Sequence, residues 1–279
     1  MPSLDRIARQ RPRPTRSAVP VGVTCEIRAL ATVAELIESY RLRYDVYGAL
    51  GYIRRFNGSK LEIDEYDMFS IPFGAFDPVS GVMIGTLRLV TTEPQPDYEG
   101  SIRQVLADHA DEELTKQALG PWPHRLPSII SQEIDRRIEA FNTEGFVVNE
   151  LSRTIVRPAY RGSGVSRGLM ELGLAYAAQH APAILIGGCL PDHVPMYARY
   201  GYIQLPQTGL DRFESVGQIA NAVVCRTDVL PQPTRGHIDA LLHSMGSGAK
   251  ECTLEIGRSS RARYSFAAPR RTRRRTMEW

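Results

Sequence analysis

Hydrophobic positions along this chain alternate between two periods, one of about two residues and one of about 3.6 residues. The shorter period predicts strands with one buried face, and the longer period predicts amphipathic helices. The predicted strands are 21–28, 71–76, 81–90, 146–156, 183–189, a strand that begins at 202, and 221–228. The predicted helices are 32–50, 101–119, 131–141, 168–180, 195–200 and 234–245. This mixture predicts a domain of the α/β or α+β class.

The helix predicted over 32–50 begins with a capping sequence. Thr32 is followed three residues later by Glu35, a spacing in which each side chain accepts a hydrogen bond from the backbone of the other residue. The apolar residues that follow share one face and are Val33, Leu36, Ile37, Tyr40, Tyr44 and Tyr47. We therefore expect one face of this helix to be buried.

Charge divides the 279 residues into a body and two tails. Residues 1–20 carry a net charge of +4 and residues 258–279 carry +7, so the overall charge of +3 leaves 21–257 with −8. Arginine-rich runs with few aliphatic residues cannot bury enough surface to fold. We predict disordered basic tails at 1–20 and 246–279 around one domain at 21–245, with a helical insertion at 91–144. The arginine runs at 11–16 and 270–275 contain no interleaved aromatic residues for stacking on bases, so we expect no nucleic-acid partner.

Composition excludes several other classes of protein. No run approaches the roughly 18 apolar residues of a membrane helix, and the first residues lack the apolar segment of a secretory signal. We therefore expect a cytoplasmic protein with no membrane span. The four cysteines are widely spaced and form no CxxC, which predicts buried free thiols rather than a zinc site or a disulfide framework.

A glycine-rich turn, Arg161-Gly162-Ser163-Gly164-Val165-Ser166, lies between a predicted strand and a predicted helix. Glycines let the backbone approach an anion closely, and the N–H groups at the start of a helix suit a phosphate. The turn matches neither the P-loop nor the dinucleotide fingerprint. Taken alone, it is equally well explained as an ordinary turn from a strand into a helix.

Two segments together resemble the GNAT acyltransferase superfamily. Val156-x-Pro158 followed by Arg161-x-x-Gly164-x-Ser166 resembles its acyl-CoA pyrophosphate loop, and 196–202 (MYARYGY) resembles its segment lYeklGF. The resemblance implies a GNAT-like fold, a central mixed and mostly antiparallel twisted sheet flanked by helices. It also implies that residues 161–166 bind the donor and that Tyr197 is a catalytic tyrosine.

Four further motifs resemble the ordered signature of acyl-homoserine-lactone synthases and the related N-acyl amino acid synthases. They are Arg43-x-x-Val46-Tyr47, Glu62-x-Asp64-x-Tyr66-Asp67, Gly85-x-x-Arg88-Leu89 and Glu150-x-Ser152-Arg153. The resemblance covers about residues 23–205. Gly51-Tyr52-Ile53 stands where lactone synthases usually carry a tryptophan in the adenosylmethionine pocket, which favours the N-acyl amino acid synthases.

The resemblance implies an N-acyltransferase of the EC 2.3.1 type. Its donor would be an acyl-phosphopantetheine thioester, carried by acyl carrier protein as partner or by CoA, and its acceptor the amine of an amino acid. It implies no permanently bound cofactor. One alternative is a lactone synthase that uses S-adenosylmethionine. An alternative of another class is a catalytically idle GNAT-like binding module.

The resemblance also suggests roles in catalysis. Glu150 is the candidate general base, Tyr197 the candidate acid for the leaving thiolate, and backbone N–H groups of the same strand the candidate oxyanion donors. A regular strand would direct Glu150 and Arg153 to opposite faces, so we expect a bulge between them. The alternative is that Glu150 only pairs with a neighbouring arginine.

The resemblance places acceptor binding at Glu62, Asp64, Asp67, Arg43, Arg88 and Arg153. Carboxylates can hold an ammonium group, and arginines can hold a carboxylate with two hydrogen bonds. The alternative for the three carboxylates is a solvated acidic loop. We expect no metal there, because no histidine lies nearby and the EF-hand pattern is absent. Cys189 is a disfavoured candidate nucleophile, because free cysteines are usually buried packing residues.

Overall fold

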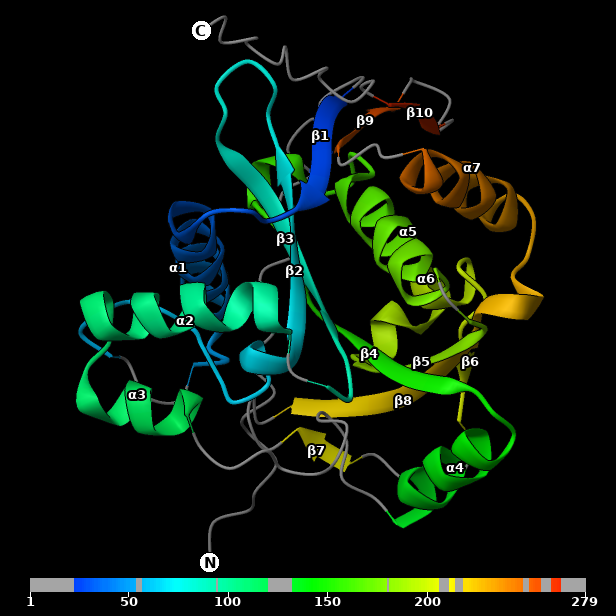
Figure 1. Ribbon diagram of the computed structural model, residues 1–279, viewed down its shortest axis with the longest axis horizontal. Coiled ribbons are helices and arrows are strands. Elements are labelled where there is room, and N and C mark those ends of the chain that lie inside the picture. Colours follow the sequence, from blue (N-terminus) through cyan, green and yellow to red (C-terminus); the bar gives the residue numbers. More distant parts are fainter. Residues whose placement is uncertain are drawn as a thin grey trace, which may run out of the picture.

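A twisted sheet with helices on both faces forms the centre of the computed structural model (Figure 1). The structure describes residues 23–53, 57–93, 95–119, 132–179, 181–205, 211–213, 218–247, 251–256 and 262–266. The strands are β1 (Val23–Ala29), β2 (Ser70–Phe76), β3 (Met83–Val90), β4 (Val147–Val156), β5 (Ala183–Cys189), β6 (Ile203–Gln204), β7 (Asp211–Phe213), β8 (Gln218–Arg226), β9 (Glu251–Ile256) and β10 (Ala262–Phe266). The helices are α1 (Val33–Leu50), α2 (Pro96–His109), α3 (Glu112–Ala118), α4 (Gln132–Thr143), α5 (Val165–Ala177), α6 (Val194–Ala198) and α7 (Thr234–Gly246).

The strand order along the sheet is β10-β9-β1-β2-β3-β4-β5-β8-β6, and β7 pairs with β8 outside this path. Neighbouring strands are antiparallel except for β4 and β5, which are parallel and joined by the crossover helix α5. The predicted fold class, a mixed and mostly antiparallel twisted sheet flanked by helices, is therefore confirmed.

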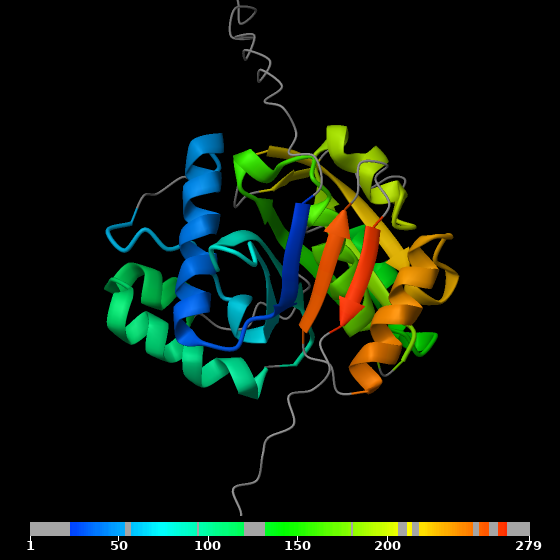
Figure 2. The same cartoon turned by 90° about the horizontal axis from the view of Figure 1, so that it is seen from above.

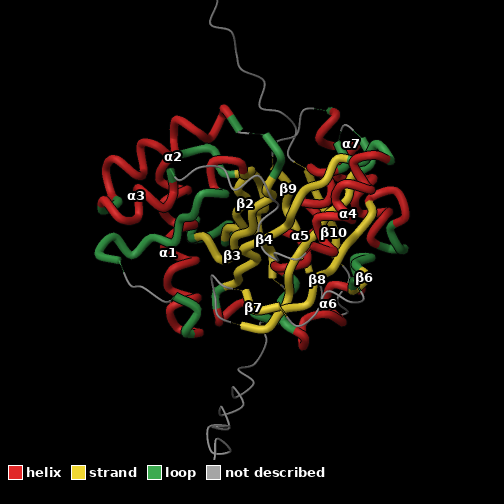
Figure 3. Tube along the Cα trace, turned by 90° about the horizontal axis from the view of Figure 1, so that it is seen from below, coloured by secondary structure: helices red, strands yellow, loops and turns green. Residues whose placement is uncertain are grey.

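Successive residues of β3 show how the helices divide between the two faces, because a strand directs alternate side chains to opposite sides. Ser39 of α1 hydrogen-bonds Thr86 at 2.7 Å. A Cβ atom placed on the adjacent Gly85 would lie 2.9 Å from Val165 of α5. Helices α1 and α5 therefore cover opposite faces. Figure 2 shows α1 (blue) and α7 (orange) on opposite sides of the strands, and Figure 3 shows α2 and α3 on the same side as α1.

The predicted helix 32–50 is confirmed together with its cap. Thr32 accepts from the backbone N–H of Glu35, and the Glu35 carboxylate accepts from that of Thr32. Leu36, Tyr40 and Tyr44 of the expected face are buried, and its other three residues are partly buried.

The single helix predicted over 101–119 is instead two helices, α2 and α3. The chain breaks between them because Asp111 caps α3, where its side chain accepts from the Leu114 N–H at 2.8 Å. The Pro121-Trp122-Pro123 sequence, which predicts a break between the helices, lies outside the described residues.

The predicted end of the domain at residue 245 is wrong for two segments of the chain. Strand β9 pairs antiparallel with β1 along the whole of 251–256, and β10 pairs with β9. Leu254 of β9 is fully buried, and its Cδ2 atom lies 2.4 Å from where a Cβ atom on Gly168 of α5 would be. Residues 1–20 and 267–279 lie outside the described residues, so disorder there stays a prediction.

The four cysteines lie in the interior of the fold. Cys25, Cys189, Cys225 and Cys252 are free and buried, as predicted. No helix among the described residues is both long and apolar enough to cross a membrane.

The buried side chain of Leu254 provides a test of the corrected boundary. Leu254→Ala should lower the free energy of unfolding by about 2–5 kcal/mol, the usual cost of emptying a packed leucine site. Leu119→Ala, at a leucine that is 42% exposed, is the matched control and should cost less than about 1 kcal/mol. Denaturant titration of both variants gives the comparison. Equal stabilities would mean that 251–256 does not pack on the domain.

Candidate active site

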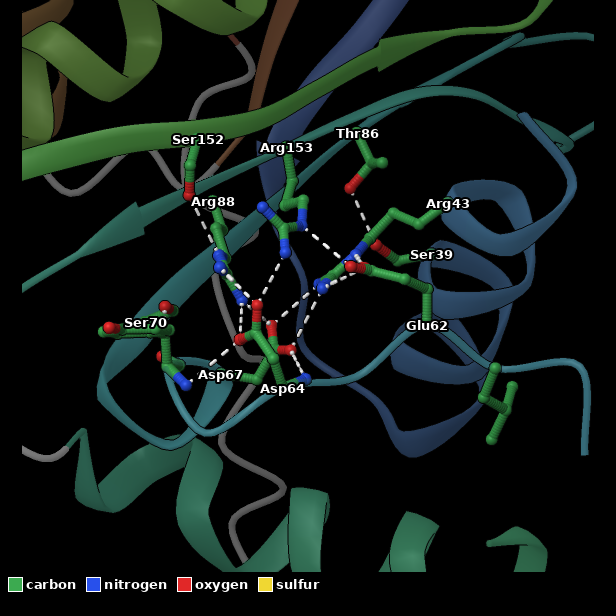
Figure 4. Close-up of polar contacts among 12 residues, drawn as sticks. Ser39, Arg43, Glu62, Asp64, Asp67, Ser70, Thr86, Arg88, Ser152 and Arg153 are labelled. Carbon is green, nitrogen blue, oxygen red and sulfur yellow. Dashed lines mark hydrogen bonds and ion pairs between the residues drawn. The ribbon is translucent and has the colours of Figure 1, made fainter. Parts of the chain in front are cut away.

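Three arginines and three carboxylates from four parts of the chain form one network on the α1 face of the sheet (Figure 4). Arg43 of α1 donates to Asp67 at 2.7 and 3.0 Å and also pairs with Glu62. Arg88 of β3 donates to Asp64 at 2.5 and 2.9 Å and lies 3.0 Å from Asp67. All six residues predicted for acceptor binding are joined in this network, because Arg153 of β4 completes it.

Arg153 closes the network from a strained backbone position. Its Nε atom donates to Glu62 at 2.9 Å, and its Nη2 atom donates to Asp64 at 2.7 Å. Its φ is +55°, in the left-handed region, and the register between β3 and β4 shifts beside it. Ser152, the preceding residue, accepts from Arg88 Nε at 3.0 Å. The predicted bulge is therefore confirmed, and it directs neighbouring side chains of β4 to the same face.

The network has as many positive as negative charges, and its side chains are almost entirely buried. Asp67 and Arg88 are 3% and 2% exposed, so the alternative of a solvated acidic loop is wrong. Burial alone would raise the pKa of Asp64, but the nearby guanidinium groups of Arg88 and Arg153 hold it well below its usual range. The most exposed pair is Glu62 with Arg153, whose side chains are 17% and 13% exposed. This pair is therefore the most accessible part of the network.

Glu150 lies where the two parallel strands stop pairing. Strands β4 and β5 are in register from Val147↔Ala183 to Glu150↔Ile186. Beyond that rung, the pairs in the described residues join β4 to β3 and β5 to β8. Glu150 is 1% exposed. Its position therefore puts a buried carboxylate at the last rung that β4 and β5 share. The stretch beyond it, where these two strands do not pair with each other among the described residues, is called the opening below.

Tyr197 of α6 is buried close to this opening. Burial raises the pKa of Tyr197, and nearby Cys189, Tyr47 and Glu150 raise it further, while a hydrogen bond with Thr154 lowers it. Tyr47 also lies under the Arg153 guanidinium, whose carbon is 5.7 Å from the ring centroid. Tyr47 therefore links the network to Tyr197. Sequence reasoning gave Tyr47 no role, although it belongs to the Arg43-x-x-Val46-Tyr47 motif.

The glycine-rich turn leads directly into α5. Gly162 and Gly164 have φ values of +79° and +91°, and Gly164 precedes a first helical turn that no side chain caps. Ser163 turns its hydroxyl inward, where it donates to the Tyr160 carbonyl at 2.5 Å, and Val165 is fully buried. Backbone N–H groups and the exposed Arg161 are therefore the groups available to an anion here.

Cys189, the disfavoured candidate nucleophile, is buried. Burial raises the pKa of Cys189 to about 11, so its thiol stays protonated near neutral pH and is a poor nucleophile. No group of three or more His, Cys, Asp or Glu side chains suited to a metal ion occurs in the described part of the chain.

Comparisons with known proteins identify a family and several similar structures. The sequence model of a family described as N-acyl amino acid synthase FeeM matches residues 38–226, which include the network, the opening and the glycine-rich turn. No curated protein matches the chain.

Several solved structures are similar to the chain. One is FeeM, an N-acyl amino acid synthase from uncultured soil microbes, with 18% identity, a TM-score of 0.48, and coverage of 77% of this chain and 94% of that one. Another is the AHL synthase LasI, with 15% identity, a TM-score of 0.46, and coverage of 76% and 93%. A third is BjaI, a CoA-dependent acyl-homoserine lactone synthase solved with SAM and isopentyl-CoA, with 18% identity, a TM-score of 0.45, and coverage of 80% and 90%.

The balanced network predicts a large cost for removing one of its charges. Asp64→Asn places an amide donor against the guanidinium groups of Arg88 and Arg153, so we expect a loss of about 3–5 kcal/mol in the free energy of unfolding at pH 7. The control is Glu99→Gln, at a surface pair with Arg103, which should change stability by less than about 1 kcal/mol.

The lowered pKa of Asp64 also predicts a dependence on pH. The unfolded chain takes up a proton near pH 4, before the folded protein does, so the contribution of Asp64 to stability is present above that pH and is lost as pH falls. Denaturant titrations from pH 6 to pH 2 should therefore show a steeper acid loss in the wild type than in Asp64→Asn. Parallel curves would contradict the assignment.

Proposed function

The chain belongs to the N-acyl amino acid synthase FeeM family, and we propose that it moves a fatty acyl group from an acyl-phosphopantetheine thioester to the amine of an amino acid or a related small amine. Acyl transfer to an amine follows from the family, which makes the chain an acyltransferase. The donor, the acceptor and the roles of the residues are the proposal. The observation that carries it is the opening between β4 and β5 beside Glu150.

The opening suits an extended chain that contains amide groups. Past Glu150, the edges of β4 and β5 that face each other carry backbone groups outside the pairing of the described residues. A pantetheine arm has two amide groups and can add to such edges as a short strand does. The uncapped first turn of α5 would hold the phosphate at the end of that arm. Phosphate and thioester would then lie along one path.

The chemistry requires a neutral amine, a stabilised oxyanion and a place for the departing thiolate. Glu150 would accept the proton from the amine. Backbone N–H groups of β4 beyond Glu150 would hydrogen-bond the oxyanion, and the Tyr197 hydroxyl would interact with the departing sulfur. Because these groups are buried, water is kept from the thioester and their electrostatic effects are stronger than in solution.

The Glu62–Arg153 pair matches an amino acid as acceptor. An amino acid presents an ammonium and a carboxylate on one carbon, and this pair presents the opposite charges 2.9 Å apart. The other four members of the network are nearly inaccessible and would hold this pair in place. We propose that Arg43, Asp64, Asp67 and Arg88 act on the acceptor through Glu62 and Arg153.

The same thioester occurs on acyl carrier protein and on CoA. We propose acyl carrier protein as the partner and the cytoplasm as the site of reaction, with acyl-CoA as the alternative donor. The purified enzyme should be offered both donors with a panel of amino acids, and products identified by mass spectrometry. N-acyl amino acids support the proposal. A product that forms only with S-adenosylmethionine would make the chain a lactone synthase, and no product with any donor would support the idle module.

Glu150→Gln tests the general base. The amide keeps the shape of the side chain but cannot take the amine proton, so kcat should fall by about 100-fold or more while the KM for the donor changes little. Glu144→Gln, on the exposed segment that precedes β4, is the matched control and should keep wild-type kcat. Steady-state kinetics with each donor give the values. An unchanged kcat in Glu150→Gln would rule out this role.

Ser166→Glu tests the donor site at the start of α5. A carboxylate in the first turn interacts favourably with the helix dipole, so the fold should keep its melting temperature. The same charge would repel the phosphate of the donor and raise its KM by about tenfold or more. Ser166→Gln separates charge from size and should leave KM within about threefold. Equal KM values in both variants would show that the donor phosphate does not bind at this turn.

A further inference from the structure

Tyr202, the residue just before β6, carries a buried hydroxyl that its surroundings do not satisfy. The residue is 3% exposed. Its Oη atom is inaccessible and has no hydrogen-bond partner among the described residues. Burying a hydroxyl without a partner costs about 1–3 kcal/mol. An isosteric phenylalanine would avoid that cost, so the hydroxyl calls for an explanation.

The turn between α6 and β6 holds Tyr202 against Tyr197. The two rings meet edge to face, with centroids 5.2 Å apart and planes at 87°. The Tyr202 N–H donates to the Tyr197 carbonyl at 3.3 Å. Gly201 between them has a φ of +91°, and a Cβ atom there would lie 2.8 Å from Pro231 Cδ. The tight turn therefore fixes the two tyrosines as a pair.

The pair lies near Cys189 and Glu150, at the ends of the paired parts of β5 and β4. Cys189, the last residue of β5, and Glu150, at the last rung shared with β4, both raise the pKa values of Tyr197 and Tyr202, after the larger effect of burial. The O–H group of Tyr202 thus stays protonated and is a donor that needs an acceptor. A substrate that enters the opening is the available source of one.

We propose that Tyr202 donates a hydrogen bond to the sulfur atom of the donor thioester as the thiolate leaves, together with Tyr197. This inference rests on the proposed function. Backbone N–H groups of β4 would serve the oxygen of the thioester, which leaves the hydroxyls of the paired tyrosines for the sulfur. Two hydroxyl donors stabilise an anion better than one, and this explains why a buried hydroxyl is present at Tyr202.

The step is balanced without any further reactant. The amine nitrogen forms a bond to the thioester carbon and gives a proton to Glu150, and the carbon–sulfur bond then breaks with its electron pair on sulfur. The thiolate accepts hydrogen bonds from Tyr197 and Tyr202 without removing their protons, and it is protonated by Glu150 or by water as it departs.

Tyr202→Phe removes only the hydroxyl. With a pantetheine thioester, thiol release should fall by about 10- to 100-fold in kcat, the effect of one hydrogen bond to a charged atom, with little change in the donor KM. The melting temperature should stay the same or rise, because a buried polar atom without a partner is removed. With a thiophenyl ester, whose thiolate needs little stabilisation, the loss should shrink to about threefold or less.

Tyr200→Phe is the matched control, because the hydroxyl of Tyr200 lies near Glu171 and Arg167 of α5 instead. It should keep wild-type kcat with both esters. An unchanged kcat in Tyr202→Phe, an equal loss with both esters, or a lower melting temperature with full activity would each overturn the proposal. Thiol release is measured separately from the acylated product, so a wild-type enzyme that releases thiol without forming an amide refutes the proposed function alone.

Discussion

The mutual neutralisation of three arginines and three carboxylates is the interaction on which the site depends. Removing one charged group from water costs several kcal/mol, and only a full set of well-placed partners offsets that cost. Arg43, Arg88 and Arg153 come from α1, β3 and β4, and their partners precede β2. The network therefore requires these four parts to take one arrangement. A partial arrangement would leave a charge buried and unpaired.

The network also holds the bulge in β4. A non-glycine residue in the left-handed region costs about 1–3 kcal/mol, and the hydrogen bonds from Arg153 to Glu62 and Asp64 hold it there. Without the bulge, Glu150 and Arg153 would face opposite sides of the sheet. With it, the candidate base and the Glu62–Arg153 pair of the proposed acceptor site share one face. The strain in the backbone is thus tied directly to the proposed chemistry.

Local patterns predicted most of the elements, and non-local contacts account for what they missed. The cap at Thr32 and strands β2, β3 and β5 depend on nearby residues, so the sequence alone was sufficient to predict them. Strand β9 was missed because its pairing partner, β1, lies more than 200 residues away and the surrounding sequence is rich in arginine. The motifs brought the six network residues together, but their spacing says nothing about which carboxylate pairs with which arginine. The unsatisfied hydroxyl of Tyr202 is a property of the packed interior and leaves no trace in a periodic pattern.

Burial changes the role that sequence reasoning suggested for Tyr197. A thiol has an ordinary pKa of about 8.5 and a tyrosine one of about 10, so proton transfer from tyrosine to thiolate is already unfavourable in water. Burial raises the pKa of Tyr197 further, which makes that transfer still less favourable. Under the proposed function, the amine enters as an ammonium and the reaction releases one proton overall. That proton has to pass through a group that gains and loses it readily. The proposed function therefore assigns proton transfer to Glu150, at the last rung of β4 and β5, and stabilisation of the thiolate to the tyrosines.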